Sequence, residues 1–286
     1  MSYNKNPMNT IEFTLLVGSG SILAGFIGAL TGLGGGVVIV PMLTLVFGVD
    51  IRYAIGASLV SVIATSSGAA AAYVKEGFSN IRIGMFLEIA TTIGALVGVF
   101  LALRLPTNLI AVIFGVVLIY SAYLSSRKRH EGIDAVAPDL IASRLRMNGS
   151  YPTPEGIQTY NVTSVPAAFG LMSIAGVISG MLGIGSGAIK VLAMDQAMRL
   201  PFKVSTATSN FMIGVTAAAS AGIYLNKGYI DPGLTMPVML GVLLGSSIGA
   251  RYLFEAETKK LRVVFSIVIF VLALEMIVSG IKGGAF

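Results

Sequence analysis

Apolar stretches of about 20 residues, with few charges among them, make up most of this chain. A helix of that length and character spans the hydrocarbon core of a lipid bilayer. The composition agrees, because 55% of the residues are hydrophobic, 11% are charged and the mean hydropathy is +0.86. We therefore expect an all-α polytopic membrane protein. Six of the stretches run without interruption, over residues 53–74, 81–103, 107–125, 203–225, 233–254 and 261–281.

Two further apolar stretches, residues 12–47 and 166–198, are broken by strings of glycine. The first string reads Gly-Leu-Gly-Gly-Gly at 32–36, and the second reads Gly-Ile-Gly-Ser-Gly at 183–187. Glycine-broken hydrophobic segments at corresponding places in two halves of a chain are typical of the binding sites of membrane carriers. We expect each break to be a turn inside the membrane.

The second half of the chain repeats the first with an offset of 151 residues. This offset aligns Ala24 with Ala175 (175 − 24) and needs no gap for about 75 residues. We expect two repeats, residues 1–125 and 166–286, joined by a polar linker at 126–165 that is a spacer or, alternatively, a regulatory loop. The matched pairs include Ser58 with Ser209, Thr65 with Thr216, Tyr73 with Tyr224 and Gly77 with Gly228.

The distribution of basic residues indicates how the broken segments run. If each crossed the membrane once, the loops would divide the basic residues 10 against 8, with no preferred orientation. If each turns back at its glycines, the division is 13 against 5, which satisfies the positive-inside rule. We then expect about 8–10 membrane segments, both termini outside and the 126–165 linker in the cytoplasm. Three crossings separate Arg52 from its counterpart Lys203, so the second repeat is inverted relative to the first.

Other classes of protein lack their usual signatures here. The chain has no cysteine and one histidine, which excludes disulfides, thiolate catalysis and cysteine-based metal sites. No P-loop lysine follows either glycine string, and Val37 stands where a dinucleotide fingerprint needs glycine. The net charge of +6 lies in short loops, where it favours membrane orientation over nucleic-acid binding. We expect no enzyme, no catalytic or metal-binding residue, no cofactor and no nucleic-acid partner.

The two breaks are expected to form one anion site. A helix that resumes inside the membrane presents free N–H groups and the positive end of its dipole. Consecutive glycine N–H groups can form a concave nest, and nearby hydroxyls can donate to an oxyanion. Alternatively, the glycines allow helices to pack closely and the hydroxyl side chains form hydrogen bonds between helices. The candidate substrate-binding residues are Gly32, Gly34, Gly35, Gly36, Ser58, Gly183, Gly185, Ser186, Gly187, Lys190, Ser209 and Asn210.

Three charged residues are singled out because we expect them at membrane depth, where a charge needs a partner or water. Lys190 follows the second glycine string, and its counterpart in the first repeat is the apolar Ile39. It can hold or compensate the anion, pair with Asp195, or extend toward the cytoplasmic surface. Glu88 and Glu275 can each carry a coupling proton, or serve as interfacial or structurally paired carboxylates.

The doubled unit, the Gly-Leu-Gly-Gly-Gly-Val-Val-Ile-Val-Pro run at 32–41 and the Ala-Thr-Ser at 207–209 resemble the TauE/SafE sulfite exporter family, also called the toluene-sulfonate uptake permeases. The resemblance implies a carrier of sulfite, sulfonates or related organosulfur or organic anions in the plasma (inner) membrane of a bacterium or archaeon. It also implies coupling to an ion gradient, with a proton or sodium as the coupling ion.

We expect a secondary transporter that exposes a midplane anion site alternately to the two sides as one inverted repeat rocks against the other. The alternative is a passive anion channel built from two re-entrant hairpins. The identity of the anion, the choice between import and export, and a monomeric or homo-oligomeric state stay open at this point.

Overall fold

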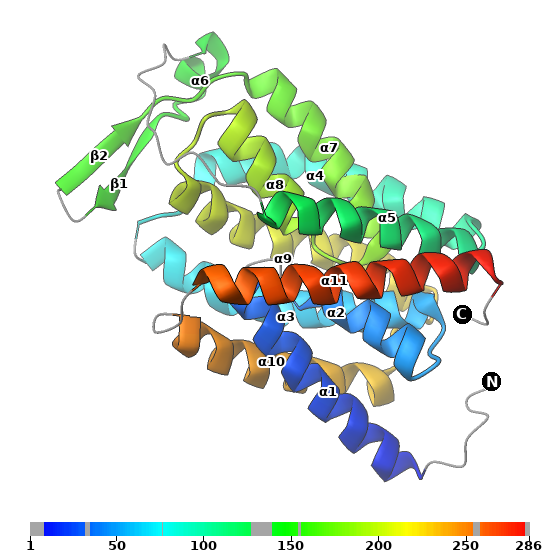
Figure 1. Ribbon diagram of the computed structural model, residues 1–286. Coiled ribbons are helices and arrows are strands. Elements are labelled where there is room, and N and C mark those ends of the chain that lie inside the picture. The colour runs from blue at the N-terminus through cyan, green and yellow to red at the C-terminus, as the bar shows by residue number, and fades with distance from the viewer. Residues whose placement is uncertain are drawn as a thin grey trace.

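The computed structural model describes residues 9–31, 35–75, 77–126, 139–153, 156–253 and 258–283, and the statements below concern this part of the chain. It contains 11 α-helices, two short π-helical segments and one two-stranded hairpin. In Figure 1 the long helices form a bundle, with the hairpin and α6 gathered at one end of it. The predicted helical architecture is confirmed.

The first half is a broken helix followed by three unbroken ones. The π-helix η1 continues α2 directly, and together they are too short to cross a membrane. The Asn80 side chain begins α4 by accepting a hydrogen bond from the Ile83 amide at 3.1 Å. The elements are α1 (Thr10–Thr31), α2 (Gly36–Pro41), η1 (Met42–Val46), α3 (Ile51–Lys75), α4 (Ile81–Arg104) and α5 (Thr107–Ser126).

The second half has the same order of elements at the same offset. The elements are α7 (Val165–Leu182), α8 (Gly187–Leu192), η2 (Ala193–Ala197), α9 (Phe202–Asn226), α10 (Pro232–Leu253) and α11 (Thr258–Ile281). The short helix α8 begins 151 residues after α2 (187 − 36). The same offset separates η2 from η1 (193 − 42) and α9 from α3 (202 − 51).

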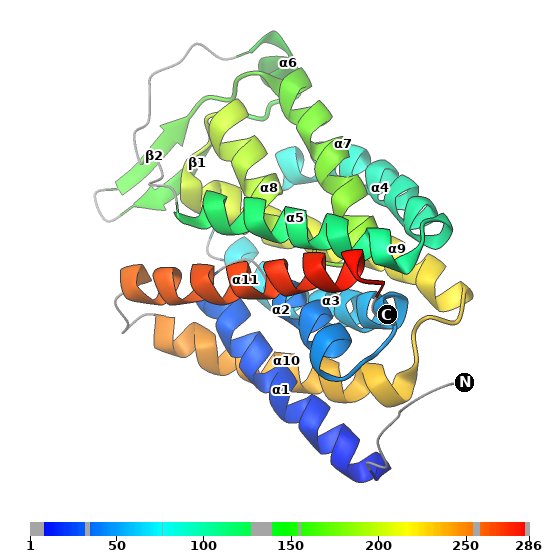
Figure 2. The ribbon, with the colours of Figure 1, turned by 45° about the vertical axis from the view of Figure 1, so that its right-hand side comes forward.

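The helices pack mainly against partners from the other half of the chain. α1 lies on α10, α4 on α7, α3 on α9 and α5 on α11. Figure 2 shows α5 and α11 side by side on one face. Glycines permit the closest approaches: a Cβ atom on Gly94 or Gly98 of α4 would overlap the α7 carbonyls of Ser173 or Val177. A Cβ atom on Gly245 of α10 would likewise overlap the Ile22 carbonyl of α1.

The outward faces of these helices are apolar. On α4 the exposed side chains recur every three or four residues, as one face of a helix requires, and they are Met85, Ile89, Ile93, Val97 and Phe100. A soluble protein rarely exposes so continuous an apolar stripe, whereas lipid covers it without penalty. Among the described helices, α4 and α7 are long and apolar enough to span a bilayer by themselves.

The linker holds ordered structure that the sequence analysis did not predict: α6 (Leu140–Arg144) and a hairpin of β1 (Gly149–Thr153) with β2 (Gly156–Tyr160). Asn80, at the start of α4, donates hydrogen bonds of 2.9 Å to the Met147 carbonyl and to the Tyr160 hydroxyl. Burial raises the pKa of this Tyr160 hydroxyl, and the hydrogen bond from Asn80 partly offsets the rise. The described part of the linker, residues 139–153 and 156–165, is thus docked onto the end of the helix bundle.

Candidate functional site

The two helix breaks lie against each other. A Cβ atom added to Gly36, where α2 begins, would lie 3.0 Å from the Gly183 carbonyl oxygen and 2.7 Å from Ser58 Oγ. Gly183 is the residue at which α7 ends, and Ser58 is on α3. The backbones of the two broken helices therefore meet beside α3. Gly32 and Gly34, which complete the first predicted motif, lie outside the described residues.

The second break depends on left-handed backbone conformations. Gly183, Gly185 and Ser186 have φ angles of 67°, 71° and 49°. A Cβ atom on Gly185 would lie 2.9 Å from Ile213 Cγ2 of α9, so this position needs glycine for space as well as for its φ. Ser186 tolerates the conformation with its hydroxyl donating to the Ala175 carbonyl at 2.7 Å. These contacts hold the start of α8 at the centre of the bundle.

The first break has a different conformation at the matching place. Gly35, the counterpart of Ser186, is right-handed, with a φ of −63°. Both breaks nonetheless resume the helix in the same way, because the Ile39 amide donates to the Gly35 carbonyl and the Lys190 amide donates to the Ser186 carbonyl. The two motifs are therefore alike in their helix starts and different in the backbone conformation of the residue that precedes the helix.

The hydroxyl residues predicted for the site make hydrogen bonds to the breaks. Ser58 Oγ donates to the Gly183 carbonyl at 2.8 Å, and Ser209 Oγ of α9 donates to the Gly187 carbonyl at 3.4 Å. Both serines are buried. The Gly183 carbonyl lies at the end of α7, where a helix leaves carbonyls unpaired, so Ser58 satisfies it, whereas Ser209 adds a second, longer contact to the first carbonyl of α8. Asn210 does not join them, because its amide donates to the Thr206 carbonyl of its own helix at 3.0 Å.

Lys190 ends in a buried polar cluster. Its Nζ donates a hydrogen bond to Thr216 Oγ1 at 2.6 Å, and the Thr216 hydroxyl in turn donates to Glu88 Oε1 at 2.7 Å. Thr91 and Thr92 each donate a hydrogen bond of 2.9 Å to the same carboxylate, on Oε2 and Oε1 respectively. Lys190 is 0% exposed and Glu88 is 7% exposed, so the lysine does not extend to the surface as one of our alternatives held.

This cluster, which we call the Lys190–Glu88 cluster, joins α8 and α9 of the second half to α4 of the first, and the repeat does not duplicate it. The residues 151 positions from Lys190 and Glu88 are the apolar Ile39 and Met239. Of the bridging groups, only Thr216 has a hydroxyl counterpart, Thr65, which donates to the Ser61 carbonyl of its own helix at 3.0 Å. The polar cluster is therefore an addition to an otherwise doubled design.

Sequence reasoning missed the threonines that hold Glu88. A signal was present, because Thr91 and Thr92 follow Glu88 by three and four residues and so share its face of α4. Thr216 was indicated as the repeat partner of Thr65 and as one of the hydroxyl residues expected near the site, but not as a partner of Glu88. The other acidic candidate, Glu275, lies exposed on α11 and is not part of the cluster.

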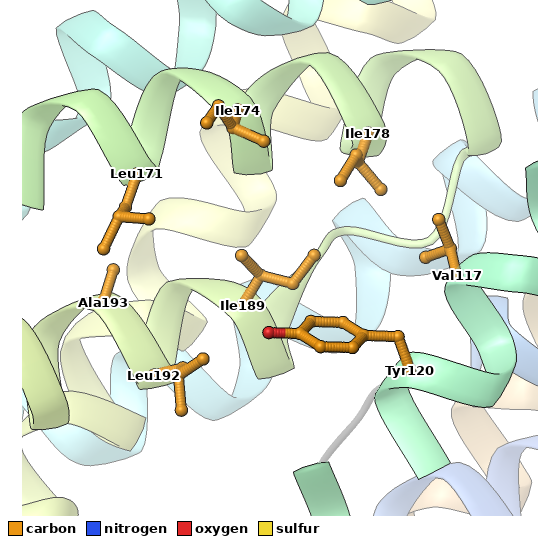
Figure 3. Close-up of a pocket in the computed structure, with 8 residues that line it drawn as sticks. All are labelled: Val117, Tyr120, Leu171, Ile174, Ile178, Ile189, Leu192 and Ala193. Atoms are coloured by element: carbon orange, nitrogen blue, oxygen red, sulfur yellow. The ribbon is translucent and has the colours of Figure 1, made fainter. Parts of the chain in front are cut away.

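An apolar groove of about 160 Å³ flanks α8 (Figure 3). In Figure 3 the ring of Tyr120 lies below Ile189 and beside Leu192, and α7 forms the opposite wall. Among the side chains that line the groove, only the Tyr120 hydroxyl is polar, which makes it a poor anion site. The lining residues are Val117, Tyr120, Leu171, Ile174, Ile178, Ile189, Leu192 and Ala193.

Apolar outer faces, two broken helices that meet at the centre and a buried charged cluster beside them define a helical membrane transporter. The chain belongs to the sulfite exporter TauE/SafE family, whose family model matches residues 17–276. This confirms the resemblance that the motifs indicated.

Similar proteins carry names that agree with this family. The probable membrane transporter protein YunE of Bacillus subtilis is 28% identical, over 95% of this chain and 99% of the relative. YdhB, a second probable membrane transporter protein of that organism, is 27% identical over 81% of this chain and 85% of the relative. A probable membrane transporter protein of Methanocaldococcus jannaschii is 24% identical over 89% of this chain and 92% of the relative. No solved structure gives a significant match.

Proposed function

We propose that this protein is a secondary transporter that moves sulfite, a sulfonate or a related small organic anion across the plasma membrane, coupled to an ion gradient. The observation that carries the proposal is the meeting of two broken helices beside a buried lysine. Burying a lysine inside a membrane protein costs free energy unless a negative charge compensates it, and a transported anion supplies such a charge.

The proposed anion site lies between the breaks and the Lys190–Glu88 cluster. In the first turn of α8 the Ile189 amide donates to the Ser186 carbonyl at 3.1 Å, whereas the amides of Gly187 and Ala188 precede the first hydrogen bond of the helix and lie next to the second break. On α9, Ser209 contacts the break and Thr216 contacts Lys190 seven residues later, so both are on one face of the helix, about 10 Å apart. An oxyanion of the size of sulfite or a sulfonate group fits that scale. Asn210 has no contact with the anion in this arrangement.

Alternating access follows from the proposed inverted repeats. The shared offset of the elements supports two repeats, as do the helix pairs, since α1 on α10 and α7 on α4 exchange when the halves are exchanged. The helices of each pair pack closely through glycines although they come from different halves of the chain. We therefore propose that each rigid unit that moves during transport contains helices of both halves rather than one whole repeat. A passive anion channel would need a continuous open path, whereas Gly36 and Gly183 are in contact here.

We also propose the orientation in the membrane: both termini outside and the linker in the cytoplasm. The charge distribution supports it, as does Figure 1, where the end of α11 and the β1–β2 hairpin lie at opposite ends of the bundle. Because the chain has no cysteine, single introduced cysteines report cleanly on sidedness. In intact cells, Lys227→Cys is expected to react with an impermeant maleimide and Ile157→Cys only after lysis. The reverse labelling pattern would contradict the proposed orientation.

The substrate class is tested by thermal stabilisation of the purified protein. A ligand that binds only the folded state at 100 times its Kd stabilises it by about 2.7 kcal/mol, which is a shift of several degrees in Tm. We expect sulfite, methanesulfonate and benzenesulfonate to raise the Tm, with acetate and benzoate as carboxylate comparisons and choline and glycerol as cationic and neutral controls. Stabilisation by the cationic or neutral solutes alone would overturn the anion proposal.

A further inference from the structure

We infer that the carboxylate of Glu88 is an internal stand-in for the transported anion, and that it must take up a proton before Lys190 and Thr216 can bind an external oxyanion. The inference rests on the proposed function and deepens it. It makes the proton the coupling ion, and it makes proton and anion move in the same direction.

The surroundings of Glu88 have the chemistry of an oxyanion site. Its two oxygens accept hydrogen bonds from the hydroxyls of Thr91, Thr92 and Thr216, at 2.7 to 2.9 Å. Lys190 completes the set through Thr216. Neutral hydroxyls beside one ammonium group would serve a sulfonate equally well, since both ligands present charged oxygens to hydrogen-bond donors. In this structure the chain's own carboxylate takes that place.

The charges explain why a proton is needed. Lys190 and Glu88 are both buried, and together they are neutral. An anion that entered beside them would add an uncompensated negative charge in a medium of low dielectric, which is strongly unfavourable. If Glu88 is protonated, the carboxyl group is neutral and the Lys190 ammonium is left without a counter-charge. An incoming anion then restores neutrality, so a proton and an anion favour each other's binding.

Among the residues that the structure describes, no other charged group makes a recorded hydrogen bond to Lys190 or Glu88. α7, which packs on α4, carries no titratable side chain, and the titratable groups of α9 are near its ends, about 20 and 12 Å along the helix from Thr216. The segment of α8 and η2 carries Asp195, which is half-buried and five residues beyond Lys190, while α4 itself has arginines near its two ends. These groups are Lys203 and Tyr224 on α9, Asp195 on η2, and Arg82 and Arg104 on α4.

The test is the pH dependence of sulfonate binding to the purified full-length chain. Methanesulfonate and benzenesulfonate remain ionised across the pH range, so any change in Kd comes from the protein. With one linked proton, Kd is expected to rise with pH, at most tenfold for each pH unit. In Glu88→Gln, which mimics the protonated carboxyl, Kd is expected to be independent of pH below neutrality, where the Lys190 ammonium group keeps its charge. Glu275→Gln, which removes the exposed carboxylate of α11, is expected to keep the rise of Kd with pH.

A second variant guards against misfolding of Glu88→Gln. Thr92→Ala removes one hydrogen bond that stabilises the ionised carboxylate, so Glu88 takes up its proton more readily. The binding profile is then expected to move toward higher pH by about one unit. A shift toward lower pH, or no shift, would count against the inference. A merely structural threonine would lower stability without moving the profile.

Flux in proteoliposomes gives the direction. An inward methanesulfonate gradient is expected to acidify the lumen of wild-type vesicles, whereas Glu88→Gln is expected to carry the anion without protons. Proton movement opposite to the anion, or a pH slope below neutrality that survives in Glu88→Gln, would overturn the inference and leave the proposed function standing. If neither wild type nor Glu88→Gln bound either sulfonate at any pH, the sulfonate proposal itself would fail, and the inference with it.

Discussion

Lys190→Met is expected to abolish anion binding and to destabilise the protein by about 3–5 kcal/mol, because it leaves the Glu88 carboxylate buried without its counter-charge. Methionine fills a similar volume, and the matching position of the first half is the apolar Ile39. The measurements are the Tm of the purified protein and sulfonate binding by calorimetry.

A double variant separates the charge effect from lost packing. Lys190→Met with Glu88→Gln removes both charges, and its stability is expected to be close to that of wild type, since replacing a buried ion pair by neutral groups is often neutral. Anion binding should stay absent in the double variant. Lys203→Met, which removes an exposed lysine at the start of α9, serves as the control with little effect. Equal destabilisation by the single and double variants would contradict this account of the cluster.

Gly185→Ala is expected to abolish transport and to lower stability by about 2–4 kcal/mol, since the new Cβ atom faces both an unfavourable φ of 71° and a 2.9 Å contact with Ile213. The helix start that follows would have to move away from the centre of the bundle. Flux and Tm are the readouts.

Gly228→Ala is the matched control. Gly228 has a φ of 76° but nothing within 4 Å of the added Cβ atom, so this variant suffers the backbone strain alone, about 1 kcal/mol. Adding Ile213→Ala to Gly185→Ala should return part of the lost transport, because it removes the atom that the Cβ atom meets. If Gly185→Ala transported as well as Gly228→Ala, close packing at the second break would not be needed for function.

The sequence predicted the membrane helices and the place of both breaks, because a bilayer demands long apolar runs and tolerates broken helices only inside the protein. It did not predict the partner of Lys190. The candidates were a neighbour, Asp195, and the surface, whereas the structure gives Glu88, 102 positions away in sequence (190 − 88). Pairing between distant helices depends on their packing, which residue spacing along one helix does not reveal.

The ordered linker escaped prediction for a related reason. A five-residue helix and a hairpin with five-residue strands have weak local preferences, and here they are fixed by contacts with the bundle, such as Asn80 with Tyr160. The linker, which we expected to be a spacer or a regulatory loop, packs in its described part against the start of α4. Asp139 shows the same dependence, since its carboxylate accepts hydrogen bonds from the amides of Ile141 and Val165.

The glycine contacts between the halves also set the order of events during synthesis. Gly94 can pack against Ser173 only after the ribosome has added 79 more residues (173 − 94). Gly25 can pack against Val242 only after 217 more residues have been added (242 − 25). The newly inserted first half therefore meets lipid with glycine faces that lack their final neighbours. Its tertiary structure is completed only when α10 and then α11 arrive, so premature termination before these helices yields a chain that membrane quality control should recognise as unfinished.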